Sequence, residues 1–257
     1  MSTIIVTGST GAVGGAAARM LRERGHNVIG TTRRAPREGE RYLDLGSLES
    51  VVAFVDGLKA DGIVADCLLN NAGTMQRSFA LNEDGFERVL ATNYIGTYLL
   101  SRLMVKAMGE GLRIVNTISL TCYTARFDRH FFEADAGSYS QLGTYASSKY
   151  AVMLFSQELA RRTGCAVDMT DPGVVDSRML HLDRWFDPLA DVLFRPLCKS
   201  PEGGALPAVN AVTGDGTQQI YRGRRHTGIP RRWRRSEDAA WLWDETERIL
   251  KTKGFDL

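Results

Sequence analysis

The chain has 257 residues, of which 44 % are hydrophobic and 24 % charged, and its formal net charge is +2. This is the composition of a globular protein, and so small a charge gives no reason to expect nucleic acid as a partner. The four cysteines and four histidines show no metal-ligand spacing, so we expect no metal and interpret the cysteines as buried thiols in a reducing, cytoplasmic compartment. No apolar run approaches the roughly 18 residues that span a membrane, and no basic segment precedes the first strand as in a signal peptide.

Short apolar runs rich in β-branched residues alternate with stretches of helical periodicity. We predict strands at 3–7, 27–31, 41–45, 66–70, 112–117, 166–170 and 218–221. Helical patterns fall at 13–24, after a capping Ser47, and at 83–91, 92–108 and 144–162. The connection 33–41 is too short for a crossover helix and should be a loop or a single turn. The alternation predicts one α/β domain over residues 1–257: a doubly wound, Rossmann-type fold with a seven-stranded, mostly parallel sheet and helices on both faces.

A glycine-rich turn joins the first predicted strand to the first helix. Gly8, Gly11 and Gly14 follow one another at intervals of three. Glycines let the backbone approach a diphosphate, and a helix N-terminus adds free N–H groups, so the turn predicts a dinucleotide-phosphate site. The second strand then ends at Thr31-Thr32-Arg33-Arg34 without an acid. A carboxylate there would bind the ribose of NAD, whereas Arg33 suits the 2′-phosphate of NADP, which we therefore prefer to NAD; a solvated arginine loop is the alternative.

Tyr145 and Lys149 lie four residues apart at the start of the predicted helix 144–162, and Ser119 follows the strand 112–117. Positions i and i+4 share one face of a helix. An ammonium beside a phenol lowers the pKa of the phenol, and such a tyrosine can exchange a proton with an alcohol or a carbonyl. One such pair is weak evidence for a catalytic tyrosine by itself, and it gains support from the other motifs of the chain.

Taken together, the motifs resemble the short-chain dehydrogenase/reductase family over nearly the whole chain. They are residues 7–14, 70–73, Asn93, 114–119, the Tyr145–Lys149 pair and 171–177, in the order of the family. The long gap between Ser119 and Tyr145 looks most like the retinol-dehydrogenase-like branch. Two features depart from that branch: the Gly-x-x-Gly-x-x-Gly spacing is more usual in the epimerase and dehydratase branch, and the segment after the second strand is shorter.

The resemblance implies a role for each matched residue. Tyr145 would be the general acid/base and Ser119 the donor to the substrate oxygen, while Lys149 would lower the pKa of the tyrosine and hold the nicotinamide ribose. Asn93 would position a water that relays protons. The implied cofactor-binding residues are Gly8, Ser9, Thr10, Gly11, Ala12, Val13, Arg33, Asp44, Leu45, Asn71, Ala72, Gly73, Tyr145, Lys149, Pro172, Gly173, Val175 and Ser177.

The resemblance also implies the reaction, the substrate region and the assembly. We expect interconversion of a ketone or aldehyde and an alcohol on a small molecule. A lid at about 178–200 alternates charges with apolar residues such as Trp185 and Phe186, which favours a lipophilic or aromatic substrate, although these residues could simply pack. The helices near 93–108 and 144–162 would form a homodimer or homotetramer through the apolar Leu99, Leu100, Leu103 and Met104.

Three questions stay open at this point. A sugar-nucleotide epimerase or dehydratase is an alternative because of the glycine spacing, but 257 residues leave little room for a nucleotide-sugar domain. A non-catalytic NADP(H)-sensing protein is a second alternative, although such proteins usually lose the tyrosine or the lysine. The arginine-rich tract 222–235 is either a solvated face or a site for an acidic substrate, an anionic carrier domain or lipid head groups.

Overall fold

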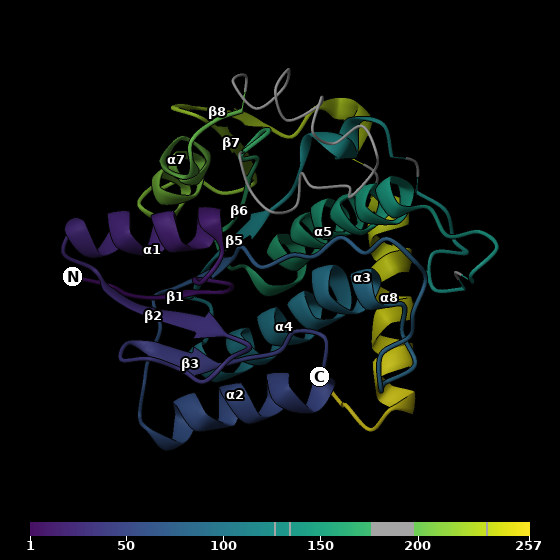
Figure 1. Ribbon diagram of the computed structural model, residues 1–257, viewed down its shortest axis with the longest axis horizontal. Helices are drawn as coiled ribbons and strands as arrows, with labels where there is room; N and C mark the ends of the chain where they lie inside the picture. The colour runs from purple at the N-terminus through teal and green to yellow at the C-terminus, as the bar shows by residue number, and fades with distance from the viewer. Residues whose placement is uncertain (126, 134, 176–197, 235) are drawn as a thin grey trace.

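The computed structural model describes residues 1–125, 127–133, 135–175, 198–234 and 236–257 (Figure 1). Their strands form one eight-stranded sheet in the order β3-β2-β1-β4-β5-β6-β7-β8. All neighbouring strands are parallel except β8, which is antiparallel to β7. The strands are β1 Thr3–Val6, β2 Asn27–Thr32, β3 Glu40–Tyr42, β4 Cys67–Asn70, β5 Arg113–Thr117, β6 Val167–Thr170, β7 Gln219–Arg222 and β8 Arg225–Gly228.

Helices cover both faces of the sheet (Figure 1). Successive side chains of a strand point to opposite faces, and in β1 this places Ile4 and Val6 in an apolar cluster with α1 and α7, while Ile5 joins a cluster with α2, α4 and α5. The helical segments are α1 Ala12–Glu23, α2 Leu48–Ala60, α3 Arg88–Leu90, a π-helical turn Ala91–Ile95, α4 Gly96–Met108, a 3₁₀ turn Leu120–Tyr123, α5 Gln141–Thr163, α7 Pro201–Val212, a 3₁₀ turn Arg231–Trp233 and α8 Ser236–Thr252.

The doubly wound α/β fold predicted from the sequence is confirmed, as are the loop between β2 and β3 and the cap of α2, where the Ser50 N–H donates to Ser47 Oγ at 3.2 Å. Because the order runs outward from β1 in both directions, the carboxyl ends of β1 and β4 meet at a topological switch point. Ligands of open α/β sheets bind at such a point.

Several elements differ from the sequence prediction. The sheet has eight strands and not seven, because Arg225–Gly228 pairs with β7 along the edge; its four residues are exposed, so it has no apolar pattern to reveal it. The pattern at 83–91 is helical only from Arg88, since the chain first turns at Gly85 with φ +81°. The helices α7 and α8 were not predicted, and the third strand is shorter than 41–45.

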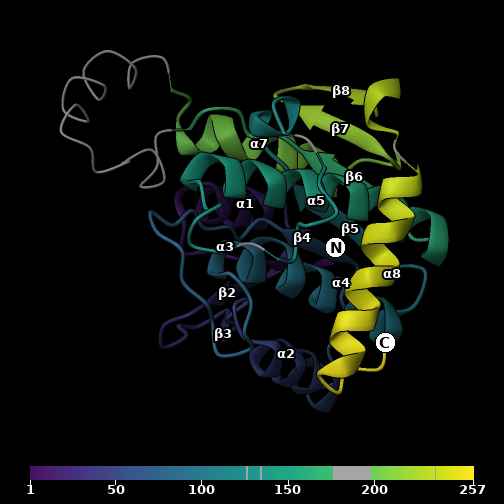
Figure 2. The ribbon, with the colours of Figure 1, turned by 90° about the vertical axis from the view of Figure 1, so that its right-hand side faces the viewer.

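The apolar residues of α4 that were predicted to join subunits lie in the core of the same chain, and α8 runs along a neighbouring face of α4 that carries Tyr98 and Arg102 (Figure 2). Leu99, Leu100 and Met104 are fully buried, so the prediction of an exposed subunit surface at these residues is wrong. Trp243 of α8 stacks on Phe155 of α5 with ring centroids 5.9 Å apart. The sequence reveals that a helix has an apolar face, but it does not reveal which part of the fold buries that face. A homodimer or homotetramer stays a prediction and would need another surface.

No helix of the described residues is long and apolar enough to cross a membrane. Ser177 and nearly all of the expected lid at 178–200 lie outside the described residues.

Candidate active site

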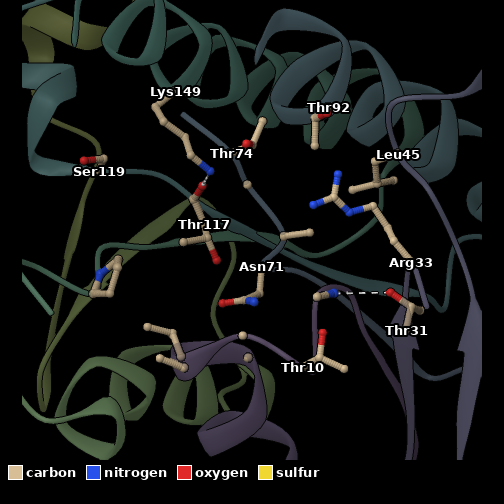
Figure 3. Close-up of a pocket in the computed structure, with 18 of the residues that line it drawn as sticks. Thr10, Thr31, Arg33, Leu45, Asn71, Thr74, Thr92, Thr117, Ser119 and Lys149 are labelled. Atoms are coloured by element: carbon tan, nitrogen blue, oxygen red, sulfur yellow. Dashed lines mark hydrogen bonds between the residues drawn. The ribbon is translucent and has the colours of Figure 1, made fainter. Parts of the chain in front are cut away.

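A cavity of about 560 Å³ opens at the carboxyl ends of β1, β2, β4, β5 and β6. Figure 3 shows Ser119 and Lys149 at one end and Arg33 with Leu45 at the other. Most residues predicted to bind cofactor or substrate line it: Gly8, Thr10, Gly11, Ala12, Val13, Arg33, Leu45, Asn71, Ala72, Gly73, Ser119, Tyr145, Lys149, Pro172 and Gly173.

The glycine-rich turn brings the start of α1 against the ends of β1 and β4. Gly8 has φ +67°, which only glycine adopts readily. A Cβ on Gly14 would lie 2.4 Å from Gly8 O and Asn71 Nδ2, so no other residue fits there. Gly11 precedes α1 without a side-chain cap, and the first N–H groups of α1 are therefore available to an anion in the cavity.

Hydrogen bonds fix the segment that follows β4. Thr7 Oγ1 accepts from the N–H groups of Asn71 at 2.9 Å and Ala72 at 3.0 Å, and Asn71 Nδ2 donates to Thr7 O at 3.0 Å. Ser9 also stabilises the local backbone, because its hydroxyl donates to Thr31 O at 3.2 Å. Ser9 does not line the cavity, although it was predicted to bind the cofactor. Ser9 thus holds the turn against β2.

The far end of the cavity is polar, and Thr31, Thr32 and Arg33 line it. Among the described residues of the lining, none has an acidic side chain. Asp44, predicted to contact the adenine, does not line the cavity, because its carboxylate accepts from the Gly46 N–H at 2.9 Å. Leu43 and Leu45 on either side of Asp44 do line the cavity, and all three residues lie beyond the end of β3 at Tyr42.

Lys149 is buried on α5, and its ammonium donates to Thr117 O at 2.9 Å (Figure 3). Burial lowers the pKa of Lys149 from 10.5 to about 8. Burial raises the pKa of Tyr145 to about 12, and its hydrogen bond with Ser119 acts in the opposite direction. The sequence argument expected a lowered pKa for Tyr145, and in this structure the pKa is raised, because loss of hydration outweighs the favourable contacts of a phenolate.

Asn93 lies behind the cavity, in the π-helical turn. Its Oδ1 accepts from the Thr74 N–H at 2.7 Å, and its Nδ2 donates to Thr74 O at 2.9 Å and to Ser148 Oγ at 3.0 Å. A Cβ on Gly96 would lie 2.0 Å from Leu45 O, so a glycine is required where α4 begins. Through its bonds to Thr74 and Ser148, the side chain of Asn93 joins the segment after β4 to α5, and it does not itself line the cavity.

The wall at the end of β6 is formed by Pro172 and Gly173. Asp171 Oδ1 accepts from the Gly173 N–H at 3.0 Å, and Gly173 has φ +74°. Val175, predicted to hold the nicotinamide, is not on this wall; its side chain is buried against Gly204 of α7. Sequence reasoning missed other lining residues, among them Thr32, Leu43, Thr74, Thr92, Thr117 and Ile118. For Thr117 the strand alternation was an available signal, whereas Thr92 reaches the cavity only through the π-helical turn.

Comparison with known proteins agrees with this geometry. The sequence model of the short chain dehydrogenase family matches residues 2–185. A polyprenol dehydrogenase of Mus musculus is 34 % identical over 235 residues, which are 80 % of this chain and 70 % of that protein. Retinol dehydrogenase 13 of Homo sapiens is 29 % identical over 278 residues, covering 96 % of this chain and 84 % of the relative. A crystal structure of an uncharacterised protein from Mycobacterium paratuberculosis has a TM-score of 0.77 and 29 % identity, covering 98 % of this chain and 94 % of that one.

The family model spans the cavity from the glycine-rich turn to Gly173, and the relatives extend the match to nearly the whole chain. The chain therefore belongs to the short-chain dehydrogenase/reductase family, in its retinol-dehydrogenase-like branch.

Proposed function

We propose that the protein is an NADP(H)-dependent oxidoreductase that interconverts a lipophilic ketone or aldehyde and the corresponding alcohol. Its family makes it an oxidoreductase of alcohols and carbonyls. The observation that carries the proposal is the single cavity that joins a glycine-rich turn and Arg33 to Ser119, Tyr145 and Lys149.

The residues that line the cavity fit NADP(H) better than NAD(H). The N-terminus of α1 and the glycine-rich turn would receive the diphosphate, and Arg33 would pair with the 2′-phosphate. The described part of the lining contains no carboxylate that would repel that phosphate or bind the ribose hydroxyls as an acid does in NAD enzymes. When bound, the cofactor supplies the hydride, and the chain supplies orientation and the proton.

The chemistry assigned to the protein is proton transfer at the substrate oxygen. Ser119 and Tyr145 share a hydrogen bond and would both contact that oxygen. The phenol of Tyr145, whose pKa burial raises to about 12, carries a proton at neutral pH and would give it to the carbonyl oxygen in a reduction or take it back in an oxidation. A preference for NADP(H) would favour the reductive direction, from carbonyl to alcohol.

Three exposed apolar side chains that lie close in the sequence to residues of the cavity support a lipophilic substrate. Leu120 follows Ser119, Leu142 precedes Tyr145 by one turn of α5, and Val174 follows Gly173; all three are exposed large hydrophobic residues. Exposed apolar side chains beside a site favour an apolar ligand. The named relatives act on polyprenol and retinol, which are lipophilic alcohols, and this supports the same class here.

The experiment is a turnover series with NADPH and NADH over ketones and aldehydes of increasing chain length. We expect turnover with NADPH, a higher kcat/KM for it than for NADH, and a kcat/KM that rises with chain length. Equal kcat/KM values for the two cofactors would refute the cofactor assignment. Activity confined to small polar sugars would refute the substrate assignment, and tight NADPH binding without any turnover would favour a sensor.

A further inference from the structure

Two arginines flank one exposed tyrosine ring beside the cavity. The Cζ atoms of Arg222 and Arg232 lie 4.8 Å and 5.3 Å from the centre of the Tyr123 ring. Trp233 packs against the same tyrosine with ring centroids 4.4 Å apart, and Arg232 also lies 5.0 Å from the Trp233 ring. Arg222 Nε donates to Asp171 Oδ2 at 3.2 Å. We call Tyr123, Asp171, Arg222, Arg232 and Trp233 the arginine–tyrosine cluster.

The fold places this cluster next to the reacting groups. Tyr123 ends the 3₁₀ turn that begins directly after Ser119, and the Ser119 side chain caps that turn by accepting from the Thr121 N–H. Arg222 ends β7, which runs parallel to β6, so its carboxyl end lies at the edge of the sheet where the cavity opens. Asp171 immediately precedes the cavity wall at Pro172, and its charge is close enough to contribute to the raised pKa of Tyr145.

The cluster has more positive charge than its protein contacts compensate. It holds two guanidinium groups and one carboxylate, and within the described parts of the chain no acidic side chain pairs with Arg232. Burial lowers the pKa of Arg222, and the charge of Arg232 acts in the same direction. Two like charges held against one ring repel each other, and an anion beside them would relieve that repulsion.

Two buried polar atoms in or near the arginine–tyrosine cluster have no hydrogen-bond partner among the described residues. Arg222 Nη2 is buried and has no hydrogen-bond partner among the described residues, and the same is true of Thr121 Oγ1, two residues from Tyr123. Buried polar atoms of native proteins nearly always have a partner, and an unpartnered donor costs free energy. A ligand with anionic oxygens would supply acceptors for the guanidinium, and the Tyr123 and Trp233 rings would pack on the carbon atoms next to them.

We propose that the arginine–tyrosine cluster binds an anionic oxygen group, a carboxylate or a phosphate, of a substrate whose carbonyl or hydroxyl lies at Ser119 and Tyr145. The substrate class is therefore amphipathic: a lipophilic carbonyl compound or alcohol that carries an acid group. The inference rests on the proposed function for the position of the reacting carbon, and it adds a second recognition point to the same site. The exposed Leu120 and Val174, which follow the cavity residues Ser119 and Gly173 in the sequence, suit the hydrocarbon part of such a ligand.

The test is a binding measurement that needs no turnover. Isothermal titration calorimetry with the full chain compares decanoate with decanol, which have the same carbon chain and differ in charge. Hydrogen bonds to charged groups contribute about 1.5–3 kcal/mol, so we expect decanoate to bind roughly tenfold more tightly or better. Arg232→Gln should reduce this preference several-fold, while Arg248→Gln, which removes an exposed arginine of α8 paired with Glu245, should leave it unchanged.

Arg222→Gln should also reduce the preference, but it leaves the buried Asp171 without its partner and could unfold the protein. Arg222→Lys keeps a cation beside Asp171 but removes the unpartnered Nη2 donor of the guanidinium. The preference of this variant for decanoate should fall while its fold is retained. Equal affinities for decanoate and decanol in the wild type would overturn the inference. A preference that survives both Arg232→Gln and Arg222→Lys would overturn it as well.

A membrane surface also carries anionic oxygens, and vesicle binding distinguishes it from a substrate. Binding of the wild type to phosphatidylglycerol vesicles that Arg232→Gln abolishes, with an unchanged preference for decanoate, would make the cluster a membrane contact and the inference wrong. Turnover of uncharged ketones reports on the proposed function alone. If uncharged ketones are reduced equally by the wild type and Arg232→Gln while the preference for decanoate is lost, both the function and the inference stand.

Discussion

Lys149 is 3 % exposed, and its ammonium has Thr117 O as its hydrogen-bond partner. The sequence placed this lysine beside Tyr145 correctly, because an i, i+4 pair is a local pattern of one helix. It could not give the direction of the two pKa changes. Those depend on how deeply α5 buries both groups, and burial disfavours the charged form of each: the lysine loses charge more easily and the tyrosine keeps its proton.

The first prediction concerns the pH dependence of stability. Because the pKa of Lys149 is about 8 in the folded chain and 10.5 ordinarily, its burial destabilises the fold fully below pH 8, and the penalty disappears as the pH rises toward 10.5. Lys149→Met should therefore raise the free energy of unfolding at pH 7 by on the order of 3 kcal/mol, less the lost hydrogen bond to Thr117 O.

Urea unfolding of the wild type and Lys149→Met between pH 7 and pH 9.5 checks this. The difference between the two proteins should shrink as the pH rises. Tyr145 titrates above this window in the folded chain and is present in both proteins, so it does not produce the trend. A difference that is constant with pH would show that Lys149 is not destabilised by its charge.

The second prediction concerns Arg33, which lies in the cavity, and its neighbour Arg34, which does not line it. Arg33→Asp should weaken NADPH binding by tenfold or more, because it replaces a charge-assisted bond to phosphate with repulsion. It should maintain or strengthen NADH binding, because an acid at this place can bind the ribose hydroxyls. Arg34→Asp makes the same change of charge one residue away. Fluorescence titration gives the dissociation constants for both cofactors. An equal loss of NADPH affinity in the two variants would mean that Arg33 acts only through the net positive charge of the region and not through a direct bond to the phosphate.

At the scale of elements, α8 accounts for the largest difference between sequence and structure. Trp243 lies against Phe155 and Tyr98, and the Arg102 guanidinium lies 4.4 Å from its ring. Tyr94 Oη and Thr246 Oγ1 are 2.8 Å apart at the same interface, and Arg162 pairs with Asp244. The apolar residues of α4 were visible in the sequence, but α8, which packs on Tyr94 and Tyr98, lies more than a hundred residues later in the chain. No local pattern connects the two.

The third prediction is that Trp243→Ala loosens α8 and exposes the face of α4 and α5. Removal of a buried tryptophan should lower the free energy of unfolding by about 3–5 kcal/mol. The uncovered apolar surface should then promote self-association, seen by light scattering as a rise in mass with concentration. Arg248→Ala, on the exposed side of α8, serves as the control. A Trp243→Ala variant with the stability and mass of the wild type would show that α8 does not protect this face.

At the scale of the whole molecule, the sheet order decides which residues meet. The motifs at Gly8, Asn71, Ser119 and Gly173 are spread over most of the chain, and the order β1-β4-β5-β6 sets their carboxyl ends side by side. The sequence predicted these positions because each motif follows a buried strand. It misplaced Asp44, whose carboxylate accepts from the Gly46 N–H in the turn after β3, and Val175, which packs on a helix that the sequence did not reveal.

The central claim is that this cavity transfers a proton through Tyr145 while it holds NADP(H), and Tyr145→Phe tests it most directly. The measurement pairs steady-state reduction of the best ketone of the chain-length series with the dissociation constant for NADPH. Loss of the transferable proton should reduce kcat by at least about a hundredfold, since general acid catalysis contributes 10²–10⁴-fold, and NADPH should bind as in the wild type. A variant that keeps more than about a tenth of the wild-type kcat would contradict the account, because no proton donor would then be missing.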